Sequence, residues 1–346
     1  MDRRTLLAAA PTLALSRLAL PGLARAQQPA PAAPPAAPRA PQPITLPPPT
    51  LAMTTVATGL HFPEAPVVMR DGSLLFVQIQ AKQVSRLKAD GKVEVVAQLE
   101  GGPNGLAIGP DKALYIANDG GRFSFNQRGP YNFPGGAPAD HVGGSIQRLD
   151  LRTCQSVPLY DSCDGKRLVA PDDLVFDRHG GMWISDYGKV KGDAGLYYAR
   201  ADGKSIKQAK GGMNAPNGIG LSPDGKQLHV SEGRQLWTFD IKGPGELGPS
   251  VSYPDAAHAM LRERSVADSL KVLADNKVCV CTLIAGGISI IDPAGQTEFI
   301  QFDDPMTTNL AFGGPDMRDV WLTSSGLGRI VKVRWPYPGL KPAYSA

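Results

Sequence analysis

The sequence predicts an all-β protein, a six-bladed β-propeller with four-stranded blades around a central channel. Three observations support this fold class. A turn followed by a short β-rich run occurs six times along the chain. The spacing of these turns is that of propeller blades. No long segment has the 3.6-residue hydrophobic periodicity of a helix.

The first 26 residues predict a twin-arginine-type signal peptide. Adjacent arginines at positions 3 and 4 precede a short apolar run, and Ala24-Arg25-Ala26 fits the small-x-small cleavage rule, which would leave Gln27 as the mature N-terminus. A disordered basic tail is the alternative. Because a spanning helix needs about 20 apolar residues, we expect no stable membrane anchor. We expect export by the twin-arginine machinery and a periplasmic or secreted location.

Residues 27–50 are almost entirely Pro, Ala and Gln, a composition that cannot form a core and favours an extended chain. They predict a linker, which leaves residues 51–346 for the propeller. The net charge of +4 comes from the first 50 residues, so the body is neutral. A neutral body has no overall field that attracts nucleic acid, and we expect no such partner. These features do not fix the oligomeric state.

The six turns set the length of each repeat. They begin at Asp71, Asp111, His179, Asp224, Asp275 and Asp316, at intervals of 40, 68, 45, 51 and 41 residues. One four-stranded propeller blade takes about 40–50 residues, so six copies predict six blades. The longest interval contains an insertion at residues 120–144 that is rich in Gly, Phe and Pro.

Each repeat also has Glu, Asp or Asn seven residues before its turn. These residues are Glu64, Asn104, Asp172, Asn217, Asp268 and Asn309. An apolar run follows each of them, so each begins the inner strand of its blade, at the end that points to the channel. The alternative is turn chemistry, because Asn and Asp often bond their own backbone. Pro-Asn-Gly, at residues 103–105 and 216–218, is also a turn signature.

A metal site explains this pattern better than turn chemistry, since Glu64 is no turn former. Three carboxylates on one axis repel one another unless a cation lies among them. Oxygen donors without His or Cys select a hard cation. We therefore expect one divalent cation, Ca²⁺ first, with Mg²⁺, Mn²⁺ or Zn²⁺ as alternatives.

Other site signatures are few. The sequence has no Gly-x-Ser-x-Gly elbow, His-Glu-x-x-His motif or Walker loop, which argues against a serine hydrolase, a zincin and a P-loop enzyme. In an exported protein Cys154 and Cys163 could form a disulfide, and the sequence leaves this open. Cys279 and Cys281 lie on one face of an apolar strand and predict two buried thiols.

Several motifs resemble the senescence marker protein / gluconolactonase / luciferin-regenerating enzyme family over about residues 53–335. They are Phe62-Pro63-Glu64, Pro103-Asn104-Gly105-Leu106-Ala107, Pro216-Asn217-Gly218 and the run from Asn309 to Asp316. The resemblance implies a six-bladed propeller with one divalent metal in its channel. Members include lactonases and, more distantly, diisopropyl fluorophosphatase-type enzymes.

By motif, the resemblance assigns the metal-ligand role to Glu64, Asp172, Asn217 and Asp268. The chain departs from the family pattern at Asp172, where a carboxylate replaces a neutral Asn ligand. This extra charge should tighten cation binding and leave the metal a weaker Lewis acid.

The resulting hypothesis is divalent-metal-dependent hydrolysis of a lactone, in which the cation polarises the carbonyl and water attacks it. Asp268 is the candidate catalytic base, because the resemblance places its counterpart at the metal. Asn104 and Asn309 would orient substrate or water. Arg167 and the 120–144 insertion would line the mouth, although surface charge explains Arg167 equally well.

Two alternatives stay open. The same metal could serve an ester or organophosphate hydrolase, since fold and ligands do not distinguish these reactions. The second alternative is a non-catalytic propeller that is stabilised by calcium and binds a partner on its face.

Overall fold

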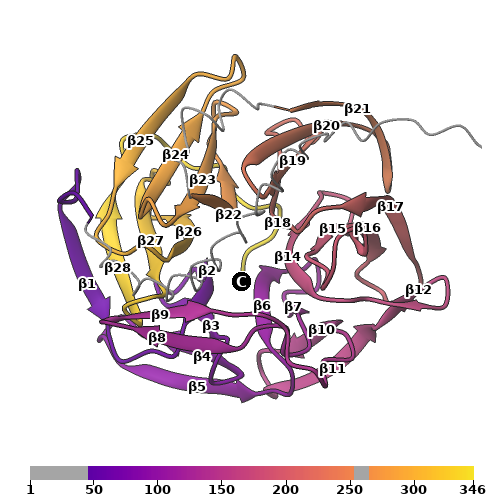
Figure 1. Ribbon diagram of the computed structural model, residues 1–346, viewed down its shortest axis with the longest axis horizontal. Coiled ribbons are helices and arrows are strands. Elements are labelled where there is room, and N and C mark those ends of the chain that lie inside the picture. Colours follow the sequence, from indigo (N-terminus) through magenta and orange to yellow (C-terminus); the bar gives the residue numbers. More distant parts are fainter. Residues whose placement is uncertain (1–45, 253–264) are drawn as a thin grey trace, which may run out of the picture. The chain divides into compact units, whose positions relative to one another are not determined.

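The computed structural model describes residues 46–252 and 265–346 and confirms the all-β, six-bladed propeller (Figure 1). The described part of the chain contains no helix, and so none that is long and apolar enough to cross a membrane. The predicted signal peptide and most of the predicted linker lie outside the described residues. Thr50, at the end of that linker, donates its N–H to the Gln301 carbonyl at 3.1 Å and accepts from the Gln301 N–H at 3.1 Å.

Each blade is a four-stranded antiparallel sheet whose first strand in the chain, in blades 1 to 5, is the innermost. Blade 1 is β2 (Pro63–Val68), β3 (Leu74–Gln78), β4 (Gln83–Leu87) and β5 (Val93–Gln98). Blade 2 is β6 (Pro103–Ile108), β7 (Leu114–Asn118), β10 (Ser145–Asp150) and β11 (Gln155–Tyr160). Blade 3 is β14 (Pro171–Phe176), β15 (Gly181–Asp186), β16 (Ala194–Arg200) and β17 (Ile206–Met213). Blade 4 is β18 (Pro216–Leu221), β19 (Gln227–Glu232), β20 (Gln235–Gly243) and β21 (Glu246–Ser252). Blade 5 is β22 (Val266–Val272), β23 (Val278–Leu283), β24 (Gly287–Ile291) and β25 (Thr297–Gln301).

Blade 6 joins the two ends of the propeller. Its inner strands are β26 (Thr307–Gly313), β27 (Asp319–Ser324) and β28 (Arg329–Arg334), and its outer strand is β1 (Met53–Ala57) from the start of the chain. Met53 pairs with Val333 and Thr55 with Val331. Because the first strand completes the last blade, the ring is closed by backbone hydrogen bonds.

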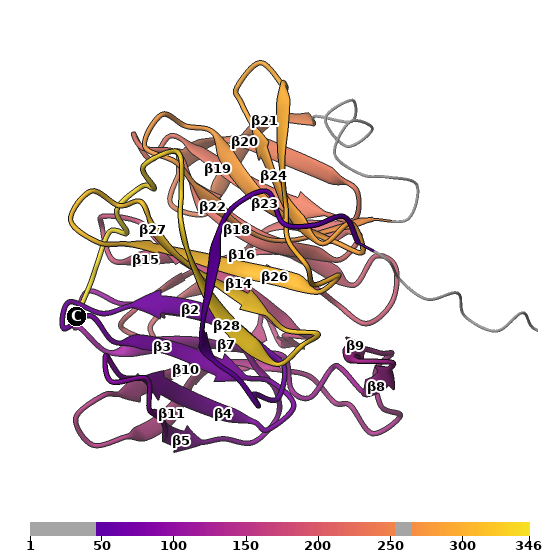
Figure 2. The ribbon, with the colours of Figure 1, turned by 90° about the vertical axis from the view of Figure 1, so that its left-hand side faces the viewer.

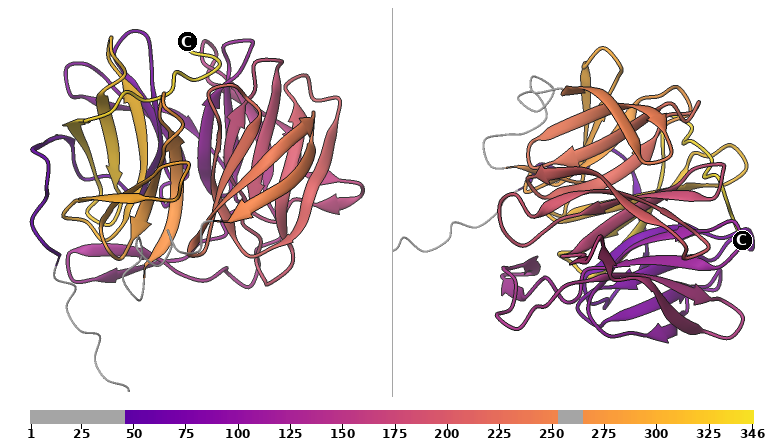
Figure 3. Two further views of the ribbon diagram at one scale, coloured as in Figure 1. Left: turned by 90° about the horizontal axis from the view of Figure 1, so that it is seen from above. Right: turned by 90° about the vertical axis from the view of Figure 1, so that its right-hand side faces the viewer.

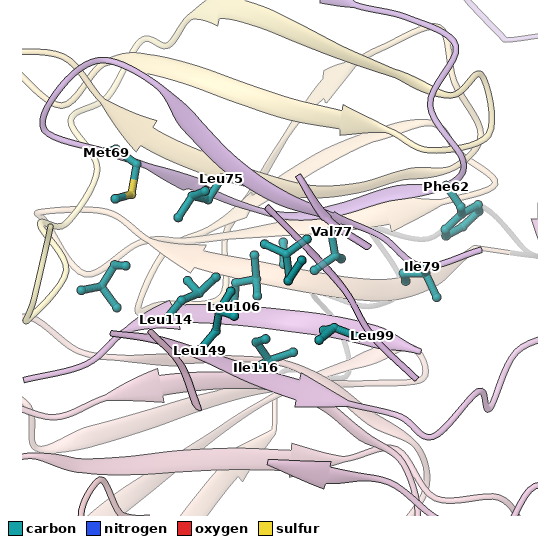
Figure 4. Close-up of a cluster of buried hydrophobic side chains, with 14 of the residues drawn as sticks. Phe62, Met69, Leu75, Val77, Ile79, Leu99, Leu106, Leu114, Ile116 and Leu149 are labelled. Carbon is teal, nitrogen blue, oxygen red and sulfur yellow. The ribbon is translucent and has the colours of Figure 1, made fainter. Parts of the chain in front are cut away.

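The core lies between the blades. The described residues form six apolar clusters, and each cluster joins two neighbouring blades. Figure 4 shows the first, in which Leu75 and Val77 of blade 1 face Leu106 and Ile116 of blade 2. Burial of these side chains stabilises the ring by about 25 cal/mol per Å² of apolar surface, so the stacked blades hold the inner strands in place around the channel.

The predicted insertion forms a hairpin over the face on which the inner strands begin. It contains β8 (Phe125–Arg128) and β9 (Tyr131–Pro134). The Asn132 N–H donates to the Gly326 carbonyl of blade 6 at 2.8 Å, and its amide donates to Gln80 Oε1 at 2.7 Å. The hairpin, an insertion of blade 2, therefore crosses blade 1 and reaches blade 6, standing clear of the blades in side view (Figure 2).

The C-terminal segment closes the opposite end of the channel. The Arg70 N–H donates to the Ala346 carbonyl at 2.9 Å, and the Tyr344 ring packs edge-on against Phe176 with 5.8 Å between centroids. A cavity of about 270 Å³ lies beneath the segment and is lined mainly by apolar residues from the ends of the inner strands. Figure 3 shows the C-terminus and the β8–β9 hairpin on opposite faces, so the hairpin face is the entrance to the channel.

The cysteines do not form the disulfide considered from the sequence, because all four are free thiols. Cys154 is exposed in the turn between β10 and β11, whereas Cys163 is buried on β12 (Ser162–Cys163), with its Sγ 3.7 Å from the Ile206 carbonyl. The two side chains therefore belong to different turns and different environments. Cys279 and Cys281 are both fully buried on β23, as predicted.

Candidate metal centre

All six polar residues of the repeats lie at the start of the inner strands, as the spacing predicts. They occupy the second or third position of β2, β6, β14, β18, β22 and β26. In each of these strands the pairing with the next strand is irregular at the polar residue. A bulge of this kind bends the strand and re-aims a side chain. The backbone irregularity therefore gives each blade one polar side chain that departs from the alternation of the sheet.

The structure does not support turn chemistry as the reason for Pro-Asn-Gly. Both copies lie inside strands, and the glycines are needed for close packing between blades. A Cβ on Gly105 would lie 2.5 Å from the Asp172 carbonyl oxygen, and one on Gly218 would lie 2.3 Å from the Leu270 nitrogen. Glycine thus lets the inner strand of the next blade approach its neighbour closely.

Hydrogen bonds link the polar side chains of adjacent blades. The Asn104 amide donates to Asp172 Oδ2 at 3.0 Å, and the Asn309 amide donates to Glu64 Oε2 at 2.7 Å. Both asparagines are buried. The structure therefore places these two predicted substrate contacts on the channel, but directs their amide nitrogens to the carboxylates.

Burial raises the pKa of the three carboxyl groups. The pKa of Glu64 rises to about 7, opposed by hydrogen bonds from the Ala65 N–H and the Asn309 amide. Burial also raises the pKa of Asp172 well above its usual value, and the charges of Asp268 and Glu64 raise it further. The pKa of Asp268 is likewise raised by burial and then by Glu64, against a hydrogen bond from Asn217. Such interactions place the three carboxylates in one electrostatic centre.

The donor set fits a hard cation. Within the described residues the buried Asn217 Oδ1 has no hydrogen-bond partner, and such an oxygen is costly unless something binds it. Three carboxylates that disfavour one another's ionisation would be stabilised by the same cation. No three His, Cys, Asp or Glu side chains in the described ranges are already arranged as a metal cluster.

Serines from the second strands fix the backbone of this centre. Ser185 Oγ donates to the Asn217 carbonyl, and Ser231 Oγ donates to the Asp268 carbonyl at 2.6 Å. Ser325, just after β27, donates in the same way to the Pro63 carbonyl. Each hydroxyl thus ties one blade to the inner strand of the next.

An ion pair between a buried aspartate and a half-buried lysine lies beside the centre and was missed by the sequence analysis. Asp173 Oδ2 lies 3.6 Å from Lys271 Nζ, which joins blade 3 to blade 5. Burial raises the pKa of Asp173, and Lys271 opposes this. The adjacent acid in Pro171-Asp172-Asp173 and the lysine within an apolar inner strand were the available signals.

The mouth of the channel contains aromatic and cationic residues that the sequence analysis also missed. Burial raises the pKa of Tyr187, and the charges of Asp172 and Asp268 raise it further, which places this ring near the carboxylates. The Arg122 guanidinium lies over Tyr187 at 5.6 Å and over Phe123 at 5.2 Å. In the sequence, the only signal that Arg122 and Phe123 belong to the site was their position within the 120–144 insertion.

Arg167 is exposed on β13 (Lys166–Arg167), beside Gly143 at the end of the insertion. It is not among the residues that hydrogen-bond to the channel carboxylates in the described part of the chain. Its predicted substrate contact therefore stays a prediction.

Comparison with known proteins places this centre in a family context. A model of the SMP-30/Gluconolactonase/LRE-like region matches residues 62–326. The gluconolactonase of Zymomonas mobilis subsp. mobilis is 25% identical over 219 residues, which are 55% of this chain and 55% of that protein. The match thus spans just over half the length of this relative. The diisopropyl-fluorophosphatase of Loligo vulgaris is 25% identical over 237 residues, 60% of this chain and 74% of that protein.

A solved structure shows the same fold. The calcium-binding protein regucalcin from Agrobacterium tumefaciens superposes with a TM-score of 0.64 and 16% identity, covering 84% of this chain and 98% of that chain. At 16% identity, this similarity shows a shared propeller fold and nothing further.

Proposed function

The chain belongs to the SMP-30/gluconolactonase/LRE-like family, and from this membership and the geometry of its channel we propose that it is a divalent-metal-dependent hydrolase that opens a lactone. One observation carries the proposal. Three buried carboxylates share one electrostatic centre at the entrance end of the channel, together with Asn217 Oδ1, which has no hydrogen-bond partner in the described part of the chain.

The residues that would hold the cation are Glu64, Asp172, Asn217 and Asp268. All four offer oxygen donors, so Ca²⁺ is the first candidate and Mg²⁺, Mn²⁺ and Zn²⁺ follow. The regucalcin of the same fold is a calcium-binding protein, which supports this order. With three carboxylates the centre carries more negative charge than a set with two, and should bind a divalent cation more tightly.

The bound cation would supply Lewis-acid polarisation of the lactone carbonyl. The chain's own residues would transfer the proton and position the substrate. Asp268 would accept a proton from the attacking water at its carboxylate, since a water held by Ca²⁺ needs a base close by. A cavity of about 490 Å³ lies between the β8–β9 hairpin and the loop at residues 325–328. None of the four candidate ligands lines it, so it bears on the approach to the channel and not on the reacting centre.

A second candidate reaction uses the same site. The match to a diisopropyl-fluorophosphatase favours hydrolysis of an ester or organophosphate as the alternative. A non-catalytic, calcium-stabilised binding module would have the same metal centre without turnover.

The test is base consumption at constant pH by protein that starts at Gln27, on a panel of lactones, with and without chelator. Acid release that chelator abolishes and Ca²⁺ or Mn²⁺ restores is the expected result. Protein that holds one metal per chain but opens no lactone would overturn the lactonase proposal. Phosphotriesters would then be assayed, and failure there would leave the binding module.

We also propose export to the periplasm or the medium by the twin-arginine machinery, on the basis of Arg3-Arg4 and the cleavage site before Gln27. Mass spectrometry of protein from the periplasmic fraction should give an N-terminus at residue 27. Recovery of the full-length chain from the cytoplasm alone would refute the export proposal.

A further inference from the structure

Asparagines and carboxylates alternate around the channel. Blades 1, 3 and 5 contribute Glu64, Asp172 and Asp268, and blades 2, 4 and 6 contribute Asn104, Asn217 and Asn309. The sequence pattern alone gives this alternation. The hydrogen bonds between the side chains indicate what role the asparagines have.

Two of the asparagines pair with the carboxylate of the blade that follows. Asn104 donates to Asp172 Oδ2 at 3.0 Å, and Asn309 donates to Glu64 Oε2 at 2.7 Å across the closure of the ring. Asn217 lies near the carboxyl group of the next blade, where its amide opposes the rise in the pKa of Asp268. The centre therefore contains two amide–carboxylate pairs that follow the same direction around the ring.

The three asparagines differ in their oxygen atoms. Asn309 Oδ1 accepts the Leu310 N–H at 2.8 Å, so both ends of this amide are occupied by the protein. Asn217 Oδ1 has no partner among the described residues and is available to a cation. Asn309 is also only 1% exposed, against 8% for Asn217, which leaves it little access to a substrate.

We propose that Asn104 and Asn309 are positioning residues, which aim the Asp172 and Glu64 carboxylates at the cation, and that Asn309 does not contact the substrate. This inference rests on the proposed metal-dependent function. Each amide binds one carboxylate oxygen, fixes the rotation of the carboxyl group and leaves its other oxygen for the metal. Partners of this kind typically change metal affinity by about 10–100-fold when they are removed.

The test uses Asn104→Leu and Asn309→Leu, which remove the amide and roughly keep its volume. Tyr115→Phe is the matched control, because it removes a buried hydrogen bond to the Ala201 carbonyl, 3.1 Å long, outside the channel. Calcium affinity is measured by titration calorimetry on metal-free protein. KM and kcat on the best lactone are then measured at saturating Ca²⁺.

For a positioning role we expect a 10–100-fold loss of calcium affinity in both Leu variants and none in the control, with KM unchanged at saturating Ca²⁺. Unchanged calcium affinity with a raised KM would overturn the inference and restore a substrate contact. If the Leu variants do not fold, Asn104→Ala and Asn309→Ala serve with the same expectations.

A double variant checks that Asn309 acts through its carboxylate. If it does, Glu64→Gln/Asn309→Leu binds Ca²⁺ no more weakly than Glu64→Gln alone. Additive losses would overturn the inference. Wild-type protein that binds none of Ca²⁺, Mg²⁺, Mn²⁺ and Zn²⁺ would refute the metal-dependent function itself, whereas equal Ca²⁺ affinity in wild type and both Asn variants would refute only the positioning role.

Discussion

His229 should make the folded protein sensitive to acid below pH 6.5. It lies on β19, is 4% exposed, and has its Nδ1 2.8 Å from Thr238 Oγ1 and its Nε2 3.3 Å from Asn276 Oδ1. Since the Asn276 oxygen can only accept, Nε2 carries the ring proton and Nδ1 accepts from the Thr238 hydroxyl. A second proton on the ring would reverse the latter bond, so that the Thr238 hydroxyl accepts, and would place a charge in the core.

The size of the effect follows from the pKa. Burial lowers the pKa of His229 from 6.5 to about 4, against a hydrogen bond to Asn276. Between these values the unfolded chain binds a proton that the folded chain does not, so stability falls as the pH falls from 6.5 to 4. At 1.36 kcal/mol per pKa unit the loss is about 3 kcal/mol.

Urea unfolding followed by tryptophan fluorescence, with chelator present, measures this loss. Wild type is compared with His229→Gln, which keeps a donor for Asn276 but does not titrate. Protonation of the buried carboxylates affects both proteins alike and cancels in their difference. The stability of wild type relative to the variant should fall by about 3 kcal/mol from pH 7 to pH 4. A difference that stays constant to within about 0.5 kcal/mol would refute the reasoning.

Three further results are expected. Glu64→Gln should weaken Ca²⁺ binding by more than about 100-fold and abolish turnover while circular dichroism stays unchanged; retained calcium-dependent turnover would exclude Glu64 as a ligand. Gly218→Ala should destabilise the protein by about 1–3 kcal/mol in urea unfolding, because its Cβ would meet the Leu270 nitrogen, whereas Gly225→Ala meets open space and costs only its backbone strain. One thiol, Cys154, should react with a disulfide reagent in native protein and four after unfolding; a native count of zero with two after unfolding would indicate a disulfide.

Much of the fold could be predicted from the sequence because a propeller is a repeat. Six turns, four of their five intervals close to the length of one blade, specify six blades, and a polar residue at constant distance from each turn specifies the start of each inner strand. This local regularity is sufficient to predict the fold, because every blade buries its apolar faces against its two neighbours in the same way. The insertion was recognised by the one long interval, although its crossing to Gly326 was not.

The pairing of the site residues could not be predicted in the same way. Asn309 and Glu64 are 245 residues apart, and Asn104 and Asp172 are 68 apart. Contacts over such separations depend on blade order, ring closure and the direction in which each bulge turns its side chain. The same is true of Asp173 and Lys271, which meet only because blades 3 and 5 face the same channel.

The sequence by itself determined the number of blades and the residue types at the channel, and from these it predicted a hard cation, since repeat length and donor chemistry are local properties. Only the tertiary structure decided how these residues act on one another. Closing the ring gives each carboxylate a neighbouring asparagine, leaves Asn217 Oδ1 without a partner among the described residues and raises the three carboxyl pKa values by burial. Burial and direction depend on every blade at once, which is why they appear only when the propeller is complete.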